Sequence, residues 1–194
     1  MTTPAVSRVG EPTADDLAVV ERQLGRTPRG VRSVVHRCQC GLPDVIESAP
    51  RLPDGSPFPT FYYLTCPRAA GAIGTLEAAG LMREMSARLL TDDALAAAYV
   101  AAHRDYLARR DAVEMLPGDP GVGGMPTRVK CLHVLVAHSL AVGPGVNPLG
   151  DEALALLPKW GSVGPCVEAG SASPYVEAGS ASPGVDTVSP VDAS

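Results

Sequence analysis

The chain has 194 residues, of which 45% are hydrophobic, and it carries a formal net charge of −5. This length suits one domain with extensions, and the hydrophobic fraction is large enough for a buried core. Residues 161–194 contain four acidic residues and no basic one, which leaves 16 basic and 17 acidic residues in residues 1–160. The folded part is therefore nearly neutral, which excludes a global electrostatic field that would attract nucleic acid or an anionic membrane.

The sequence shows no pattern typical of a targeting or membrane-spanning segment. Residues 1–16 contain no basic start followed by an apolar run, as a secretory signal would. The apolar stretch from Leu132 to Val142 contains two histidines and is too short to cross a bilayer. We therefore expect a cytoplasmic protein with no membrane partner, in which reduced cysteines are favoured over a disulfide framework.

The first half of the chain predicts one helix followed by a sheet. Residues 1–12 suggest a flexible arm, and Thr13 is a suitable N-cap for a short amphipathic helix that ends at Gly25. Segments 31–37, 44–48 and 60–65 are separated by turn residues and predict three strands. Their short connections favour an antiparallel meander.

The second half of the chain predicts helices. The apolar spacing between Ile73 and Leu89 is typical of one long or broken helix, and Thr91 and Thr127 are suitable N-caps for two more. A short last helix is expected from Asp151. We predict an α+β fold, in which a three-stranded antiparallel sheet packs four to five helices mainly on one face.

The composition changes at Gly161. A nine-residue unit that begins Val-Glu-Ala-Gly-Ser-Ala-Ser-Pro at Val167 recurs at Val176. Small, polar, proline-punctuated repeats cannot bury a core. We therefore predict a single domain over residues 13–160 and a disordered tail over residues 161–194, with Cys166 outside the domain.

Four cysteines of the predicted domain are candidates for one metal or thiol site. Cys38 and Cys40 follow the first predicted strand and Cys66 follows the third, so a meander brings these three thiols to one edge of the sheet. Cys131 lies in the first turn of the helix expected from Thr127, where the helix dipole favours a thiolate. The predicted ligands are Cys38, Cys40, Cys66 and Cys131.

Several cofactors are compatible with these cysteines. Four thiolates suit tetrahedral Zn²⁺, and they also suit an iron–sulfur cluster. In the alternative without a cofactor, the cysteines are small buried hydrophobic residues. Three histidines are alternative ligands: His36 shares a strand face with the thiols, and His133 and His138 follow Cys131 on the predicted helix.

Two groups of basic residues are candidates for anion binding. Arg128 and Lys130 follow a glycine-rich loop at the expected helix N-terminus, where backbone N–H groups favour an anion. A second group has no interleaved aromatic residues for base stacking, so we expect a solvated face rather than nucleic-acid binding. This second group consists of Arg22, Arg26, Arg29, Arg32 and Arg37.

Separated motifs resemble one protein family. They are His-Arg-Cys-x-Cys-Gly-x-Pro at residues 36–43, Tyr-Leu-Thr-Cys-Pro at 63–67, Gly-Met-Pro-x-Arg-Val-Lys-Cys-Leu-His at 124–133 and Asn-Pro-x-Gly-Asp at 147–151. In this order they are similar to the actinobacterial family catalogued as domain of unknown function 501. The resemblance implies a bacterial cytoplasmic protein and supplies no activity.

Two functions remain open from the sequence. The first is a zinc-stabilised binding or regulatory module with a protein partner. The second is a metal- or thiol-dependent enzyme that acts on an anionic, for example phosphorylated, substrate beside Arg128 and Lys130. A closed four-thiolate shell favours the module, and an open coordination position favours the enzyme.

Overall fold

A three-stranded antiparallel sheet lies at the centre of the computed structural model, which describes residues 10–118, 120–162 and 164–167. Its order is β1–β2–β3, with β1 at Val31–Arg37, β2 at Pro43–Ser48 and β3 at Tyr62–Leu64. The predicted α+β fold and its meander are confirmed. Most of the predicted arm and the repeats of the predicted tail lie outside the described residues.

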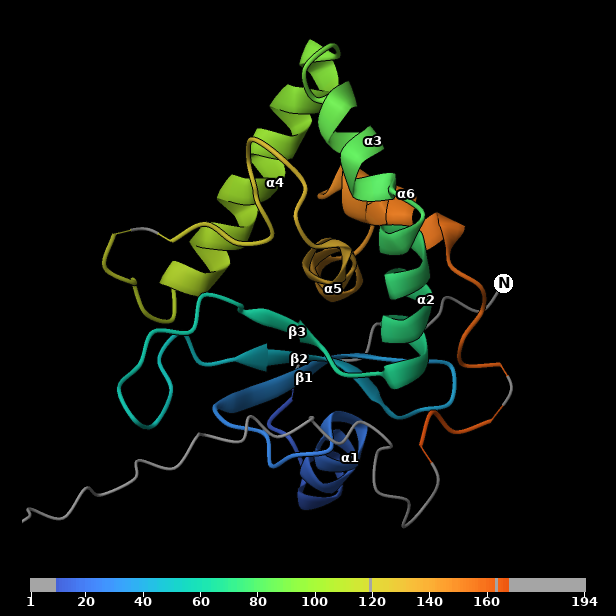
Figure 1. Ribbon diagram of the computed structural model, residues 1–194. Coiled ribbons are helices and arrows are strands. Elements are labelled where there is room, and N and C mark those ends of the chain that lie inside the picture. The colour runs from blue at the N-terminus through green and yellow to red at the C-terminus, as the bar shows by residue number, and fades with distance from the viewer. Residues whose placement is uncertain (1–9, 119, 163, 168–194) are drawn as a thin grey trace, which may run out of the picture.

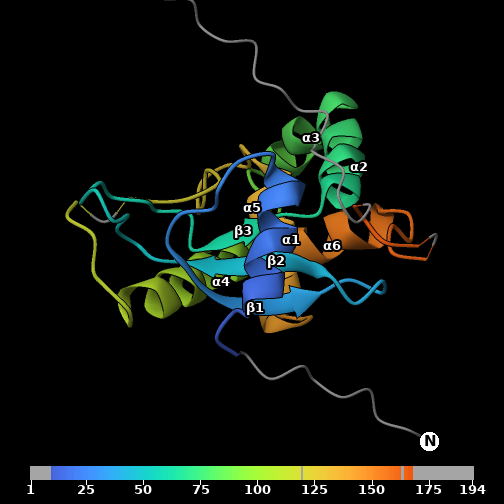
Figure 2. The ribbon, with the colours of Figure 1, turned by 90° about the horizontal axis from the view of Figure 1, so that it is seen from below.

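Helix α1 (Ala14–Leu24) covers one face of the sheet, as the views from the side and from below show (Figures 1 and 2). Its start is fixed by a capping box. The Asp16 backbone N–H donates to the Thr13 hydroxyl, and the Thr13 backbone N–H donates to the Asp16 carboxylate, each at 3.1 Å. Gly25 ends the helix in the left-handed conformation. The predicted first helix is therefore confirmed at both ends.

The other five helices of the described chain lie on the opposite face of the sheet (Figure 1). They are α2 (Pro67–Ala78), α3 (Leu81–Arg88), α4 (Asp93–Asp111), α5 (Leu132–Val142) and α6 (Pro148–Leu156). The helix expected between Ile73 and Leu89 is broken into α2 and α3 at Gly80, whose φ of 92° is accessible to glycine at little cost.

Helix α5 is the centre of the core and contacts β3, α2 and α6. Residues 134–139 of this helix are all buried, so it has no solvated face, as expected for a helix enclosed by other elements. The described residues form no helix that is both long and apolar enough to cross a membrane.

Helix α5 begins at Leu132, so the start predicted at Thr127 is wrong. The preceding loop closes on itself, because the Gly123 carbonyl accepts from the Lys130 N–H at 2.7 Å. Gly124 has a φ of 90°, and a Cβ atom there would lie 2.7 Å from the Arg128 carbonyl oxygen. The hydrogen bond and the close backbone packing at Gly124 hold residues 123–130 in a turn, so the helix begins only after it.

Candidate metal centre

Two local structures place three thiols at one end of the sheet, as the meander predicts. The turn after β1 is closed by the Cys38 N–H, which donates to the Leu42 carbonyl at 3.0 Å, and by the Gly41 N–H, which donates to the Cys38 carbonyl at 2.9 Å. This turn presents Cys38 and Cys40. Cys66 is the N-cap residue of α2 and is fully buried.

Cys166 brings a fourth thiol to the same place. Its Sγ lies 3.3 Å from the Sγ of Cys38 and 3.3 Å from that of Cys40. The Cys66 thiol is near enough to raise the pKa of the Cys166 thiol, but it lies outside the group of three whose sulfur atoms are within 4.8 Å of one another. Cys38 and Cys166 are 6% and 7% exposed, so the group is closed to solvent on most sides.

The segment that follows α6 reaches the thiols because it packs closely on the turn after β1. A Cβ atom at Gly161 would lie 2.9 Å from both the backbone nitrogen and the Cβ of Gln39, so only glycine permits this approach. The Arg68 guanidinium, in the first turn of α2, donates to the Gly164 carbonyl at 3.0 Å. In Figure 1 this segment descends beside α2 to the turn after β1.

These contacts change two expectations. Gly161 and Cys166 are buried, whereas residues 162, 164 and 165 are exposed. Cys166, expected outside the domain, therefore contacts it. The thiol that joins Cys38 and Cys40 is that of Cys166, and Cys131 lies in a different group. The sequence offers one signal for Cys166, which is that the repeats begin only at Val167.

The surroundings of Cys166 favour a neutral thiol when no cation is bound. Burial, followed by the nearby Cys66 thiol, raises the pKa of Cys166 to about 12. The buried carboxylate of Asp44 adds a smaller contribution in the same direction. Asp44 accepts from His36 Nδ1 at 2.7 Å through one oxygen, and its other oxygen has no hydrogen-bond partner. His36 therefore pairs with Asp44 in the structure.

Cys38 and Cys40 are joined as a disulfide, which the sequence did not predict. The turn brings their Cα atoms to 5.4 Å, within the range that a disulfide needs. In the reduced state the same sulfur atoms fit one metal ion. Tetrahedral thiolates on zinc lie about 3.8 Å apart. The 3.3 Å separations from Cys166 would have to widen by about half an ångström, and the bonded sulfur atoms of Cys38 and Cys40 would have to separate further. Cys38, Cys40 and Cys166 thus form a group that could hold a metal ion.

A second group combines Cys131 with His133 and with Glu77 of α2. His133 Nδ1 lies 3.8 Å from the Cys131 Sγ and 3.2 Å from Glu77 Oε1. The hydrogen bond with Cys131 is the main cause that raises the pKa of His133 above its ordinary value, against the effect of burial. Sequence reasoning missed Glu77. Its one signal is an acidic residue in the last turn of a helix, where the dipole disfavours a carboxylate.

His138 is fully buried, and its contacts are those of a core residue. Its Nε2 lies 2.9 Å from Asp105 Oδ2, and its Nδ1 lies 3.3 Å from Asn147 Nδ2. Its ring stacks on that of Tyr62 with centroids 5.8 Å apart. Burial lowers the pKa of His138, although the hydrogen bond to Asp105 opposes the shift. The structure pairs His138 with these residues rather than with a thiol.

The predicted anion site is only partly assembled. Arg128 and Lys130 are exposed and flank the buried Val129. The start of α5 already has an acceptor from the protein, because the Leu132 N–H donates to Glu77 Oε1 at 2.7 Å. Anion binding at Arg128 and Lys130 therefore stays a prediction.

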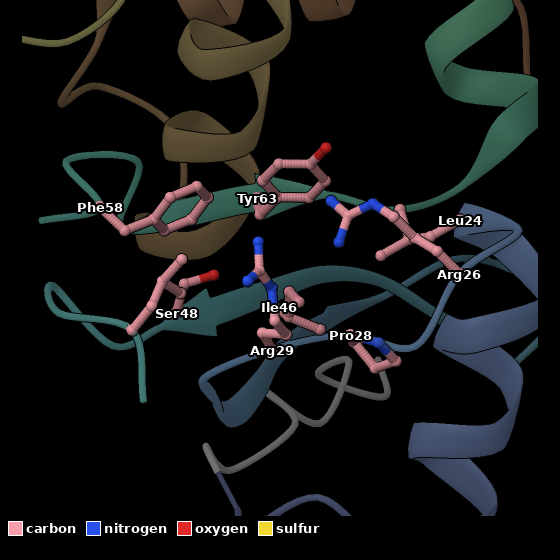
Figure 3. A pocket seen from close by; sticks show the side chains of 9 residues that line it. Leu24, Arg26, Pro28, Arg29, Ile46, Ser48, Phe58 and Tyr63 are labelled. Carbon is pink, nitrogen blue, oxygen red and sulfur yellow. The ribbon is translucent and has the colours of Figure 1, made fainter. Parts of the chain in front are cut away.

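A shallow pocket on the α1 side of the sheet gathers part of the basic group with two aromatic rings (Figure 3). Arg26 and Arg29 lie there beside Phe58 and Tyr63. Its cavity volume of about 50 Å³ has room for a few waters and is far below that of a typical small-molecule site. Arg32 and Arg37 are paired with Glu47 and Asp16 respectively.

Comparison with models of protein families gives a match to part of the chain. Residues 34–155 match the family described as protein of unknown function (DUF501). The match includes Cys38, Cys40, Cys66 and Cys131, and it ends before Cys166. No curated protein and no solved structure matches the chain. Since the matched residues make up more than half of its length, this chain belongs to the DUF501 family.

Proposed function

We propose that this protein is a metal-stabilised binding or regulatory module of the bacterial cytoplasm, in which four thiolates hold one zinc ion. The single observation that carries the proposal is the convergence of Cys166 on Cys38 and Cys40, with both sulfur separations at 3.3 Å. The four ligands are Cys38, Cys40, Cys66 and Cys166.

The role of this ion is structural rather than catalytic. Three of the four thiols are buried. The sulfur atoms of Cys38, Cys40 and Cys166 lie within 4.8 Å of one another, and Cys66 must move closer to complete a tetrahedral shell that leaves no position for a substrate. The ion joins the turn after β1, the start of α2 and the segment after α6. A single ion is favoured over an iron–sulfur cluster, because the sulfur atoms of Cys38, Cys40 and Cys166 lie within 4.8 Å of one another.

The cytoplasm supplies the reducing conditions that this function needs. The Cys38–Cys40 disulfide must gain two electrons and two protons from a thiol reductant to become two thiols. Zinc then replaces the thiol protons, and four thiolates become its ligands. The disulfide and the zinc site are therefore alternative states of the same residues. Given its closed metal site, we propose that the module acts through a protein partner.

Metal analysis of protein purified without oxygen and without chelator tests the proposal. We expect Cys166→Ser to lose one equivalent of zinc and to melt at a lower temperature than the wild type. Ser162→Ala is the matched control, because it changes the same segment and removes only a hydrogen bond to the Lys159 carbonyl. Equal zinc content in the two variants would refute the site. If the wild-type protein contained iron and inorganic sulfide instead of zinc, the four thiols would hold an iron–sulfur cluster.

A further inference from the structure

Glu77, Cys131 and His133 lie where the end of α2 meets the start of α5, apart from the four thiols of the first site. Cys131 is the N-cap residue of α5, and its side chain makes no capping hydrogen bond. Each of the three residues is only partly buried. The group is therefore pre-assembled and within reach of a solute.

The oxygen acceptors on both sides of the His133 ring favour a positive charge on or beside it. Its Nε2 lies 3.2 Å from the Ala70 carbonyl oxygen, and its Nδ1 lies 3.2 Å from Glu77 Oε1. Both partners are acceptors, whereas a neutral imidazole has only one N–H. In either tautomer one ring nitrogen would direct a lone pair at an oxygen. A second proton or a metal ion on the ring removes this conflict.

We propose that Glu77, Cys131 and His133 form a second metal site, specific for a zinc-like divalent cation. The Ala70 carbonyl accepts a hydrogen bond from Nε2–H of His133, so the lone pair of Nδ1 is available to the ion. This is the usual arrangement of a metal-binding histidine. A thiolate, an imidazole and a carboxylate form a ligand set that suits zinc.

The spacing of the ligand atoms agrees with this ion. Zinc bond lengths and tetrahedral angles place a sulfur and a nitrogen ligand about 3.6 Å apart, and a nitrogen and an oxygen ligand about 3.4 Å apart. The observed distances are 3.8 Å from Cys131 Sγ to His133 Nδ1 and 3.2 Å from His133 Nδ1 to Glu77 Oε1. The site can accept an ion with shifts of a few tenths of an ångström.

The two sites differ in what they leave open. The second site offers three protein ligands, so the fourth position of a tetrahedral ion is free for water. The side chains of Glu77 and His133 are 22% and 33% exposed, which gives solvent access to this position. Three ligands and a water are the arrangement of catalytic zinc sites, where the ion lowers the pKa of the water.

Protection of Cys131 from alkylation tests the site in the wild-type chain. Reduced protein is treated with iodoacetamide with and without saturating Zn²⁺, and the modified peptide is quantified by mass spectrometry. We expect Zn²⁺ to slow alkylation of Cys131 by about tenfold or more, because the metal-bound thiolate is a weaker nucleophile. An unchanged rate would overturn the proposal and assign the cation to a proton on His133.

A variant pair gives a second, independent measurement. Glu77→Gln keeps an oxygen for the Leu132 N–H but loses the charge, so the fold is retained. Glu84→Gln is the matched control, since Glu84 is an exposed residue of the neighbouring helix. We expect Glu77→Gln to abolish zinc protection of Cys131 and to bind one equivalent of zinc less than Glu84→Gln. Equal protection in both variants would refute the site. Cys166→Ser should leave this protection unchanged, which separates the second site from the first.

Discussion

The thiol of Cys166 lies 3.3 Å from the thiol of Cys38, although 128 residues separate them in the chain. This contact closes the chain from the end of β1 to the segment after α6 into one loop. A bond or a shared metal ion across a loop of this length restricts the unfolded chain strongly and stabilises the folded state.

A pair of truncations measures the contribution of this closure. One chain ends after Val167, and the other ends after Gly164, so they differ only in residues 165–167 and hence in Cys166. We expect the shorter chain to lose one equivalent of zinc and to be less stable by about 2–4 kcal/mol. Urea denaturation of the two reduced, zinc-loaded chains provides the comparison. The same midpoint for both would show that Cys166 adds nothing.

Gly161→Ala tests the close approach that delivers Cys166 to the site. The new Cβ atom would meet the Gln39 backbone nitrogen at 2.9 Å, so the segment must move away from the turn after β1. We expect a loss of about 1–3 kcal/mol in stability and weaker zinc binding.

Gly71→Ala is the control for that substitution. Gly71 lies inside α2, and a Cβ atom there would meet no atom within 4 Å. We expect alanine at this position to stabilise the protein by about 0.5–1 kcal/mol, because glycine disfavours a helix interior. If Gly161→Ala lowered the zinc affinity less than Gly71→Ala did, the close packing of Gly161 on Gln39 would not be what brings Cys166 to the site.

Oxidation should release zinc from the first site. Hydrogen peroxide takes two electrons from the thiolates of Cys38 and Cys40, which form a disulfide while the peroxide is reduced to water. We expect zinc release, followed with a chromophoric chelator, to keep pace with the loss of two hydrogens from the peptide that contains Cys38 and Cys40. Zinc that stays bound to the oxidised protein would be incompatible with a site that needs both thiolates.

The Asp16 carboxylate should make the protein sensitive to acid. The Arg37 guanidinium donates to both Asp16 oxygens, at 2.7 and 2.9 Å, and this pair lowers the pKa of Asp16 from 3.8 to about 2. Because the folded-state pKa is lowered, this stability is fully present above the unfolded-state pKa and is lost as the pH falls toward 2. The shift corresponds to about 2 kcal/mol, less the screening at the partly exposed Arg37.

Asp16→Asn should therefore destabilise the protein at neutral pH by up to about 2 kcal/mol and reduce the loss of stability on acidification. Asp15→Asn is the control, since Asp15 is the exposed neighbour in the same helical turn. Denaturation by urea near pH 7 and near pH 3 measures the difference. Parallel pH profiles for the wild type and Asp16→Asn would exclude the ion pair as a source of acid sensitivity.

His138 should contribute to the pH dependence at a higher pH. Burial lowers its pKa in the folded state, while Asp105 and Asp151 raise it and Arg109 lowers it further. The neutral ring is therefore favoured on folding. The stability that it provides is present above the unfolded-state value of 6.5 and is lost as the pH falls below it.

His138→Gln removes this titration but keeps a polar side chain. We expect it to cost about 1–3 kcal/mol near pH 7, because Asp105 and Asn147 lose their partner, and to flatten the stability profile between about pH 7 and 5. Chemical denaturation across that range gives the profile. A variant whose stability falls as steeply as that of the wild type would show that His138 does not drive the change.

Local patterns in the sequence determined the sheet, most of the helices and the position of three thiols. Strand propensities and turn residues act over a few neighbouring positions, so the meander and its edge with Cys38, Cys40 and Cys66 could be predicted. The capping box at Thr13 is equally local. The family resemblance agreed with the match, but neither reaches Cys166.

Only the tertiary structure decided the ligand sets. Cys166 joins the first site because Gly161 lets a distant segment pack on Gln39, and no pattern within a short window encodes that approach. Cys131 lies in the second group because the turn of residues 123–130 delays α5, and Glu77 then accepts from the Leu132 N–H at its start. A contact between segments far apart in the chain depends on how whole helices pack. The sequence could therefore identify the thiols but not pair them.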